Sequence, residues 1–490
     1  MHYKDIDELK EKNRVFFYFS EISKIPRPTF FEKEISDFIK IWAENLNLEA
    51  YQDSKNNLLI RKKASLGYEN KEAVILQAHV DMVCEKSENS SHDFFKDSID
   101  LILDGDILST GNKTTLGADD GIGVAIAMAI LEDKTLKHPA IDVILTTAEE
   151  EDMSGALNLD PSWFKTNKII NIDHVSDNEI IVGSCGGKAV ELKFKLEYKN
   201  ISENLNFYKI KLFNLAGGHS GEDIDKGRSN AIVLLGRLLN KFRESFEFDI
   251  LDIKGGNFRL AIPREAYILI GIERKNEEIF KKILSEFELY NKLTLSPSDK
   301  NLSILLEEVK DLNTSNSKSF SENFKHKIID TIILSPNGIL NMFESLNAVE
   351  SSCNLGELYI KVDFIFFISE IRATFEENKK FIYEKIALLA KRFMGEIRTF
   401  YHYPSWLYKE KSNLQIKASD IYKDLYTQDV KILTVHAGLE CSCFEEKIKN
   451  MDAISIGPNM WDLHSPKERV SISSVEKIYK FLTALLENLD

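Results

Sequence analysis

GIGVAIAMAIL (residues 121–131) and IDVILTT (residues 141–147) decide the fold class of the first part of the chain. The first stretch consists of small and apolar residues, which predicts a helix that is buried against a sheet. The second is a short apolar run with β-branched residues, which is typical of a buried strand. Similar runs at residues 73–78 and 168–172 predict further strands. Strands that alternate with helices indicate an α/β layer around a mostly parallel sheet.

A different pattern begins near residue 190. Residues 189–196 and 208–212 alternate apolar with polar side chains, which is typical of an antiparallel sheet with one solvated face. Residues 231–239 predict a helix, and residues 358–366 predict another strand. This region is therefore predicted to be an α+β domain.

After residue 400 the first pattern returns, with a predicted strand at residues 431–435 and a final helix at residues 475–489. We therefore predict that residues 191–400 form a domain inserted into a first domain. The first domain would consist of residues 1–190 and residues 401–490.

The composition narrows the class of protein. A chain of 490 residues exceeds what one hydrophobic core usually supports, which agrees with two domains. The formal net charge of −15, with no basic stripe, argues against a nucleic-acid partner. A polar N-terminus and the lack of a run of ~18 apolar residues predict neither a signal peptide nor a membrane span. Five cysteines at irregular spacing favour reduced thiols in a cytoplasmic protein.

Metal-type ligands follow several of the predicted strands. His79 and Asp81 come after the strand that ends at Ala78, and positions i and i+2 of an extended chain point the same way. This spacing favours His79 as a metal ligand and Asp81 as the carboxylate that holds its other ring nitrogen. Without further ligands, the same pair would fit an ordinary loop.

Two pairs of carboxylates lie at similar places. Asp119 and Asp120 precede the buried helix; one of them fits an N-cap, which leaves the other free to bridge two cations. Glu149 and Glu150 follow the strand at residues 141–147, at the edge where α/β sheets bind ligands. Four acids in a row also fit a solvated turn. Adjacent carboxylates nevertheless allow one to bind a metal and the other to act on metal-bound water.

Two further candidate ligands complete the set. Asp173 ends the strand at residues 168–172, and His464 follows a predicted strand and a Gly-Pro turn. Each alone fits a surface or core position. Together, two imidazoles and several carboxylates without cysteine predict two zinc-type ions that share a carboxylate, an arrangement that is typical of a hydrolase.

The stretches that carry these residues resemble the M20 metallopeptidases, and among these the aminoacyl-histidine dipeptidases, also called cytosolic non-specific dipeptidases. The matching stretches span the whole chain and are residues 22–28, 79–81, 116–123, 147–150, 217–221, 227–231, 336–338, 436–441 and 462–466. The resemblance implies a zinc-peptidase-like catalytic domain, with a mixed sheet between helices, and an inserted lid domain with an antiparallel sheet. It also implies a zinc-dependent dipeptidase that hydrolyses Xaa-His and other dipeptides.

The resemblance assigns two Zn²⁺ ions to each subunit, with Co²⁺ or Mn²⁺ as alternatives. The implied ligands are His79 and Asp173 for one ion, Glu150 and His464 for the other, and Asp119 between them. Asp120 stands where the family usually has asparagine, and of the two aspartates Asp119 aligns better with the bridging position.

The same resemblance implies the catalytic and substrate-binding groups. Asp81 would orient His79, and Glu149 would be the general base. In the lid, His219 would stabilise the oxyanion, and Asn230 and Arg372 would bind the backbone and carboxylate of the substrate.

Other readings remain open at this stage. The same metal pair would serve an N-acyl amino acid deacylase, and a non-catalytic peptide-binding homologue would keep the same scaffold. The chain would act either as a homodimer through the lid, or as one chain whose enlarged lid supplies both halves of the site.

Overall fold

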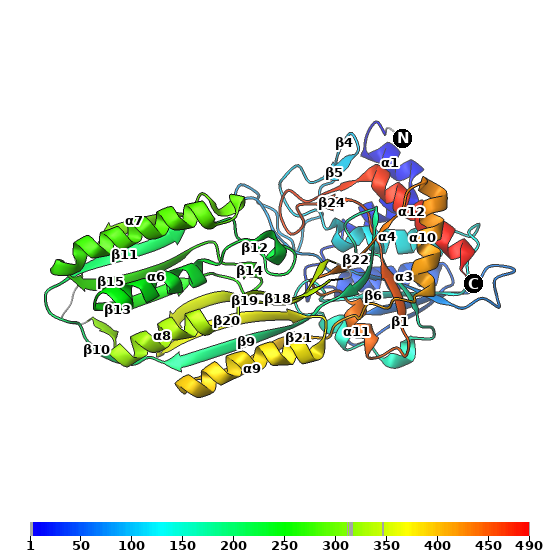
Figure 1. Ribbon diagram of the computed structural model, residues 1–490. Helices are drawn as coiled ribbons and strands as arrows, with labels where there is room; N and C mark the ends of the chain where they lie inside the picture. Colours follow the sequence, from blue (N-terminus) through cyan, green and yellow to red (C-terminus); the bar gives the residue numbers. More distant parts are fainter. Residues whose placement is uncertain (1–2, 311, 313–316, 345–346, 490) are drawn as a thin grey trace. The chain divides into compact units, whose positions relative to one another are not determined.

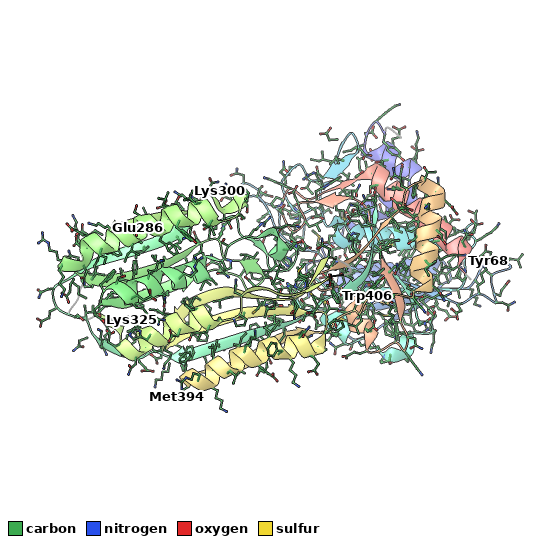
Figure 2. The ribbon with its side chains drawn as sticks, viewed as in Figure 1. Tyr68, Glu286, Lys300, Lys325, Met394 and Trp406 are labelled. Carbon is green, nitrogen blue, oxygen red and sulfur yellow. The ribbon has the colours of Figure 1, made fainter. Side chains whose placement is uncertain are left out.

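The computed structural model describes residues 3–310, 312, 317–344 and 347–489, and the chain divides into two compact units (Figure 1). Unit 1 comprises Met1–Ser184, Trp406–Thr434 and Leu439–Asp490, and unit 2 comprises Cys185–Ser405 and Val435–Gly438. The chain leaves unit 1 at Ser184 and re-enters it at Trp406; the backbones of these two residues bond to each other, and the Trp406 side chain is buried (Figure 2).

The sheet of unit 1 has eight strands in the order β1-β2-β6-β3-β7-β23-β8-β22. In chain order they are β1 (Glu49–Gln52), β2 (Leu58–Lys62), β3 (Val74–His79), β6 (Ile141–Thr146), β7 (Lys168–Asn171), β8 (Glu179–Ser184), β22 (Lys431–Val435) and β23 (Asp452–Ser455). The central strands β6, β3, β7 and β23 run parallel, and β1, β2 and β8 pair antiparallel to their neighbours. This mixed sheet confirms the predicted α/β class.

Helices cover the sheet of unit 1 and form its core. The stretch at residues 121–131 lies in α4 (Ala118–Glu132), which packs on β3 and on α2 (Arg14–Ile22). The other helices of this unit are α1 (Ile6–Lys12), α3 (Lys33–Asn45), α5 (Ser154–Leu157), α10 (Asn413–Tyr426), α11 (Cys441–Glu445) and α12 (Ile472–Asn488). A small sheet has the order β24-β25-β5-β4 and contains β4 (Ile102–Asp104), β5 (Ile107–Ser109), β24 (Met460–Trp461) and β25 (Arg469–Ser471). Among the described residues, no helix is both long enough and apolar enough to cross a membrane.

Unit 2 is built on one large sheet whose pairings are all antiparallel, as predicted. Its strands are β9 (Gly186–Lys195), β11 (Leu205–Phe213), β13 (Phe248–Gly255), β15 (Ala266–Glu273), β16 (Ser303–Glu308), β18 (Gly338–Phe343), β19 (Ala348–Lys361), β20 (Phe364–Ala373) and β21 (Glu396–Tyr403). Two-stranded ribbons join β10 (Tyr198–Asn200) to β17 (Lys318–Phe320) and β12 (Gly218–His219) to β14 (Ala261–Ile262). The helices α6 (Ala231–Ser245), α7 (Glu277–Thr294), α8 (Glu322–Leu334) and α9 (Glu376–Phe393) lie along the sheet (Figure 1).

The two halves of this sheet have the same topology. The elements β11-α6-β13-β15-α7-β16 form module A, with strand order β16-β11-β15-β13. The elements β9-α8-β19-β20-α9-β21 form module B, with strand order β21-β9-β20-β19 when read from its own outer edge. Module A is inserted between β9 and α8, and the two modules meet where β13 pairs with β19. Unit 2 therefore contains two βαββαβ modules joined edge to edge.

One strand prediction was wrong. Residues 358–366 form no single strand, because the chain turns at Val362 between β19 and β20. Val362 is 83% exposed and has a φ of 55°, a conformation that β-branched residues rarely adopt. The alternation of side chains continues across this short turn without a glycine or proline, so no residue in this stretch signals the reversal.

Candidate metal centre

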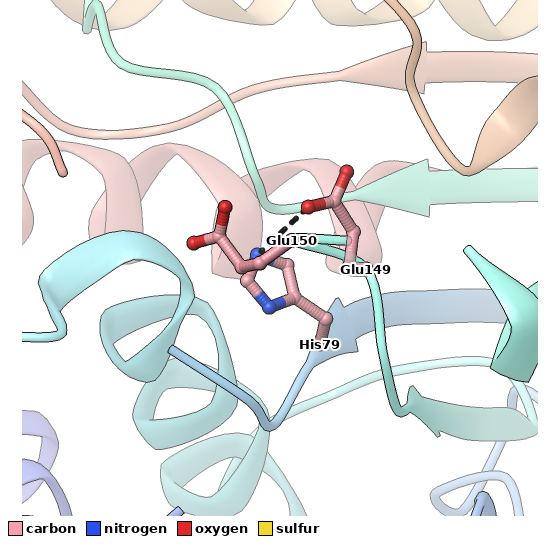
Figure 3. Close-up of side chains that lie close together, drawn as sticks. All are labelled: His79, Glu149 and Glu150. Carbon is pink, nitrogen blue, oxygen red and sulfur yellow. Dashed lines mark ion pairs between the residues drawn. The ribbon is translucent and has the colours of Figure 1, made fainter. Parts of the chain in front are cut away.

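Three adjacent strands bring the predicted ligands to one edge of the sheet in unit 1. His79 is the last residue of β3, Glu149 and Glu150 follow β6, and Asp173 follows β7. Because β6, β3 and β7 are parallel, their carboxyl ends meet at the same edge. His79 and Glu149 lie 3.9 Å apart between Nε2 and Oε2, beside Glu150 (Figure 3).

Asp119 lies between the two histidines. Its Oδ1 is 3.1 Å from His79 Nε2, and its Oδ2 is 3.3 Å from His464 Nε2. Asp119 sits at the start of α4, and its peptide bond to Asp120 is cis. One carboxylate thus presents a separate oxygen to each imidazole, which is the geometry that a bridging ligand needs.

Each histidine has a second carboxylate partner. Asp173 Oδ1 lies 3.6 Å from His79 Nε2, and Glu150 Oε2 lies 3.0 Å from His464 Nε2. The ligand atoms of His79, Asp119 and Asp173 all lie within 4.8 Å of one another, and so do those of Asp119, Glu150 and His464. A third group of this kind joins His79, Glu149 and Glu150. The first two groups share Asp119 and contain all five predicted ligands.

Asp81 supports both sides of this centre. Its Oδ1 lies 3.4 Å from His79 Nδ1 and accepts the backbone N–H of Glu149 at 3.2 Å. Its Oδ2 accepts the backbone N–H of Glu150 at 3.2 Å and the hydroxyl of Thr29 at 3.0 Å. A single buried carboxylate therefore orients the His79 ring and holds the turn that carries both glutamates.

Asp120 has a different task from Asp119. Its Oδ2 accepts the backbone N–H of His79 at 3.1 Å, and its Oδ1 accepts that of Gly123 at 3.2 Å in the first turn of α4. Of the two adjacent aspartates, Asp120 bonds backbone groups and Asp119 faces the imidazoles.

Burial and mutual repulsion dominate the electrostatics of the centre. Burial, followed by the charge of Asp119, raises the pKa of Glu150 to about 7. Burial also raises the pKa of Asp173 to about 6, against the opposing effect of His79, and raises that of Glu149 well above its usual value. Burial favours a neutral His464 ring, but Asp119 and Glu150 outweigh it and raise its pKa to about 12.

The donor set fits divalent cations. Imidazole nitrogens and carboxylate oxygens without thiolates suit zinc, cobalt or manganese. Glu150 Oε1 is buried and, within the described part of the chain, has no hydrogen-bond partner. More carboxylates converge here than two imidazoles can balance, and bound cations would compensate this excess of negative charge.

Sequence reasoning gave no role to two residues that shape the centre. Glu468 accepts the backbone N–H groups of four consecutive residues, at 2.7 Å from Leu116, 3.0 Å from Gly117, 2.8 Å from Ala118 and 3.3 Å from Asp119. Glu468 stands between Lys467 and Arg469 in the sequence, which is typical of a solvated segment, so no signal marked it.

Arg27 is the second of these residues. Its guanidinium is buried and donates to the carbonyls of Val80, Asp81 and Gly117 at 3.0, 3.2 and 2.6 Å. It ties the loop after β3 to the loop before α4. Arg27 lies in the stretch at residues 22–28 that carries the family resemblance, and that stretch was the available signal.

The three predicted residues of the inserted domain lie in unit 2. His219 belongs to module A and Arg372 to β20 of module B, and Arg372 Nη2 lies 3.5 Å from His219 Nε2. Arg372 is 3% exposed; its Nη1 donates to the Tyr403 hydroxyl at 2.6 Å, and its Nη2 to Ser220 Oγ at 3.4 Å. The two modules thus place a histidine and a buried arginine together.

Asn230 is the N-cap of α6 and is 4% exposed. Its Oδ1 accepts the backbone N–H of Ile232 at 2.9 Å, and its Nδ2 donates to Leu355 O at 2.9 Å and Asn337 Oδ1 at 3.0 Å. These bonds link module A to module B and give Asn230 a structural role within unit 2.

Two imidazoles and several carboxylates around a shared carboxylate, at the carboxyl edge of an α/β sheet, define the class of two-metal hydrolases. Comparison with known proteins narrows this class. Residues 210–295, which lie in module A, match the family model of the peptidase dimerisation domain. The chain is 33% identical over 472 residues to the cytosol non-specific dipeptidase of Escherichia coli (strain K12), and the alignment covers 96% of each chain. The chain belongs to the M20 family of metallopeptidases and is therefore a hydrolase of peptide bonds.

Solved structures agree with this assignment. The structure is similar to the crystal structure of aminoacylhistidine dipeptidase from Vibrio alginolyticus, with a TM-score of 0.85, 31% identity, and coverage of 97% of this chain and 96% of the other. Similarity to aminopeptidase PepT from Bacillus cereus ATCC 10987 has a TM-score of 0.56 at 14% identity, covers 98% of each chain and concerns the fold alone.

Proposed function

We propose that the chain is a cytoplasmic zinc dipeptidase that hydrolyses dipeptides, including those with C-terminal histidine. The observation that carries this proposal is the position of Asp119, whose two oxygens face His79 and His464 separately. The proposed ligands are His79 and Asp173 for one ion, Glu150 and His464 for the other, and Asp119 for both. The names of the relatives from Escherichia coli and Vibrio alginolyticus support dipeptides as the substrate class.

When bound, the two ions supply a Lewis acid for the scissile carbonyl and lower the pKa of bound water. We propose that Glu149 acts as the general base, which takes the proton from the attacking water and delivers it to the leaving amine. Glu149 lies beside the proposed ligands, but it is farther from His79 Nε2 than Asp119 and Asp173 are. The two aspartates therefore suit the ligand positions, and Glu149 suits the role of the base. Asp81 holds the His79 ring and the Glu149 backbone in position relative to each other.

Unit 2 supplies the remaining proposed groups. His219 would donate to the developing oxyanion, and the buried guanidinium of Arg372 would bind the substrate carboxylate. The burial of Arg372 supports this role, as does its Nε, which has no hydrogen-bond partner among the described residues. Asn230 would act on the substrate backbone only indirectly, by holding the start of α6, because its amide already bonds within unit 2.

We further propose that one chain provides both groups of the lid. His219 and Arg372 come from modules A and B of the same chain and lie 3.5 Å apart. Module B pairs with the β13 edge of module A through β19. A homodimer, which the match to a peptidase dimerisation domain supports, would then join two chains that each hold both groups.

A substrate panel tests this function. The zinc-loaded protein is incubated with dipeptides, including Xaa-His, with their N-acetyl analogues and with a tripeptide. The proposal expects hydrolysis of the free dipeptides and little of the other two groups. Preference for the N-acetyl analogues would make the chain a deacylase, and two bound zinc ions with no hydrolysis at all would make it a binding protein.

A further inference from the structure

A row of buried polar side chains crosses the sheet of unit 1 just below the ligand-bearing edge. Gln77 on β3, Asn171 on β7 and Ser455 on β23 lie directly opposite one another in register. Thr146 on β6 lies opposite His79, two residues further along, and extends the row through its side chain. All four are at most 1% exposed, in the part of a parallel sheet where apolar residues are expected.

The members of this row bond to one another. Asn171 Nδ2 donates to Gln77 Oε1 at 2.6 Å, and Ser455 Oγ donates to Asn171 Oδ1 at 2.5 Å. Gln77 Nε2 lies 3.2 Å from Thr146 Oγ1. The row therefore links four neighbouring strands through side chains as well as through their backbones.

The row is tied directly to two of the proposed metal ligands. Gln77 precedes His79 by two residues, so the two share one face of β3, and Asn171, the last residue of β7, precedes Asp173 by two residues. Asn171 Oδ1 also accepts the backbone N–H of Asp173 at 3.3 Å. A displacement of the row would be transmitted to His79 and Asp173.

Glu440 anchors the row from outside the sheet. Its Oε2 accepts from Gln77 Nε2 and from Thr146 Oγ1, both at 2.5 Å. Its Oε1 is buried and has no hydrogen-bond partner among the described residues, and the residue as a whole is fully buried. Burial raises the pKa of Glu440 to about 8. Burial of a carboxyl group with one unpartnered oxygen is unfavourable. Because the other oxygen bonds to side chains of two strands, we infer that Glu440 has a specific structural role in the sheet.

We propose that Glu440 is a positioning residue for one metal site: it fixes the spacing of β3 and β6 and thereby places His79 and, through Gln77 and Asn171, Asp173. The proposal takes its ligands from the proposed function. Within the described part of the chain, Glu150 and His464 make no hydrogen bond to the row, so the effect falls on the ion held by His79 and Asp173. Since a single oxygen makes both contacts, glutamine would preserve them.

Zinc titration of Glu440→Ala and Glu440→Gln, followed by calorimetry and by metal analysis after gel filtration, tests the proposal. Wild type is expected to bind two equivalents. Glu440→Ala should keep one tight equivalent and bind the other about 10–100-fold more weakly, as is usual when the partner of a ligand is lost. Glu440→Gln should bind both as wild type does. Glu191→Ala, which removes a buried carboxylate from unit 2, serves as the matched control and should also keep two equivalents.

Thr146→Val provides a milder variant should Glu440→Ala fail to fold, because it removes one of the two contacts while keeping the shape of the side chain. It is expected to weaken the same single equivalent by a smaller factor. Two tight equivalents in Glu440→Ala or, if that variant does not fold, in Thr146→Val would overturn the proposal, as would equal weakening of both ions or loss of one ion in Glu440→Gln. Metal binding is read without substrate, so a failure to hydrolyse dipeptides would reject the proposed function without deciding the role of Glu440.

Discussion

The metal centre of unit 1 and the Arg372 cluster of unit 2 both bury polar side chains, but they satisfy them in different ways. Around Asp119 the neighbours are mostly carboxylates that repel one another, and burial raises the pKa values of Glu150 and Asp173. Around Arg372 the neighbours are complementary, because Tyr403 and Ser220 accept the bonds that the guanidinium donates. The first group needs added positive charge, whereas the second is largely complete within the fold. Substitutions in the metal centre should therefore affect mainly chemistry, whereas substitutions of the structural residues Asn230 and His436 in unit 2 should affect mainly stability.

Removal of metal should have the largest effect. A chelator is expected to abolish hydrolysis completely, and zinc should restore it. The melting temperature should rise on zinc addition, because a ligand at 100 times its Kd stabilises the folded state by about 2.7 kcal/mol per site. Calorimetry with and without zinc checks this. Full activity after exhaustive chelation would contradict the role given to unit 1.

Glu149→Gln should have the next largest effect. Loss of the proposed general base is expected to lower kcat by ~10²–10⁴-fold while two zinc equivalents stay bound. Steady-state kinetics with metal analysis of the same sample checks this. Glu151→Gln, an exposed neighbour, is the control and should retain most of the activity. Near wild-type turnover by Glu149→Gln would assign the base to another residue.

Asn230→Ala tests the opposite side of the comparison. The substitution removes the N-cap of α6 and leaves Leu355 O and Asn337 without their amide donor. The free energy of unfolding should fall by about 2–3 kcal/mol, the sum of a lost cap and lost buried hydrogen bonds. Equilibrium unfolding of the whole protein in denaturant measures this change in the free energy of unfolding. A stable variant with an unchanged midpoint would show that the bonds of Asn230 are not structural.

His436 offers a smaller, pH-dependent effect in unit 2. Its ring lies 2.7 Å from Ser352 Oγ, and burial together with the positive charge of Arg372 lowers its pKa to about 3. A ring that is neutral when folded takes up a proton on unfolding, so stability falls as the pH drops below the unfolded value of about 6.5. His436→Asn should lose less stability than wild type between pH 7 and pH 5. Parallel pH profiles of the two proteins would show that His436 becomes protonated without loss of the fold.

Co-expression of two inactive variants should restore no hydrolytic activity. Co-expressed His219→Ala and Arg372→Ala chains, each with its own tag, are expected to show no more activity than the two variants measured separately. The reason is that modules A and B of one chain bring the two residues together. Recovery of activity in the doubly purified complex would mean that the residues meet across two chains.

The sequence predicted the ligand set because metal ligands stand at the ends of apolar strands, as with His79 after β3 and Asp173 after β7. Parallel strands end at a common edge, so the strand pattern alone predicts that such residues converge. The residue pattern by itself could not divide the work between Asp119 and Asp120, because either one fits a helix N-cap; only the family resemblance assigned the bridge to Asp119.

Other features left no trace in the sequence pattern. Glu468 lies in a highly charged segment and accepts hydrogen bonds from four backbone N–H groups far away in the sequence. Only the tertiary structure reveals this role. The two modules of unit 2 share a topology without an obvious sequence repeat, since a fold can persist after the side chains that specify it have changed. The turn at Val362 was missed because the hairpin between β19 and β20 places this residue in a backbone conformation that its residue type disfavours.

Anomalous diffraction at the zinc absorption edge, from crystals grown with zinc, is the most direct test of the proposed pair of zinc ions that share Asp119. We expect two peaks, one on either side of the Asp119 carboxylate. One would mark the zinc ion bound by His79 and Asp173, and the other the zinc ion bound by Glu150 and His464. A single peak, or peaks that do not share Asp119, would contradict this proposal.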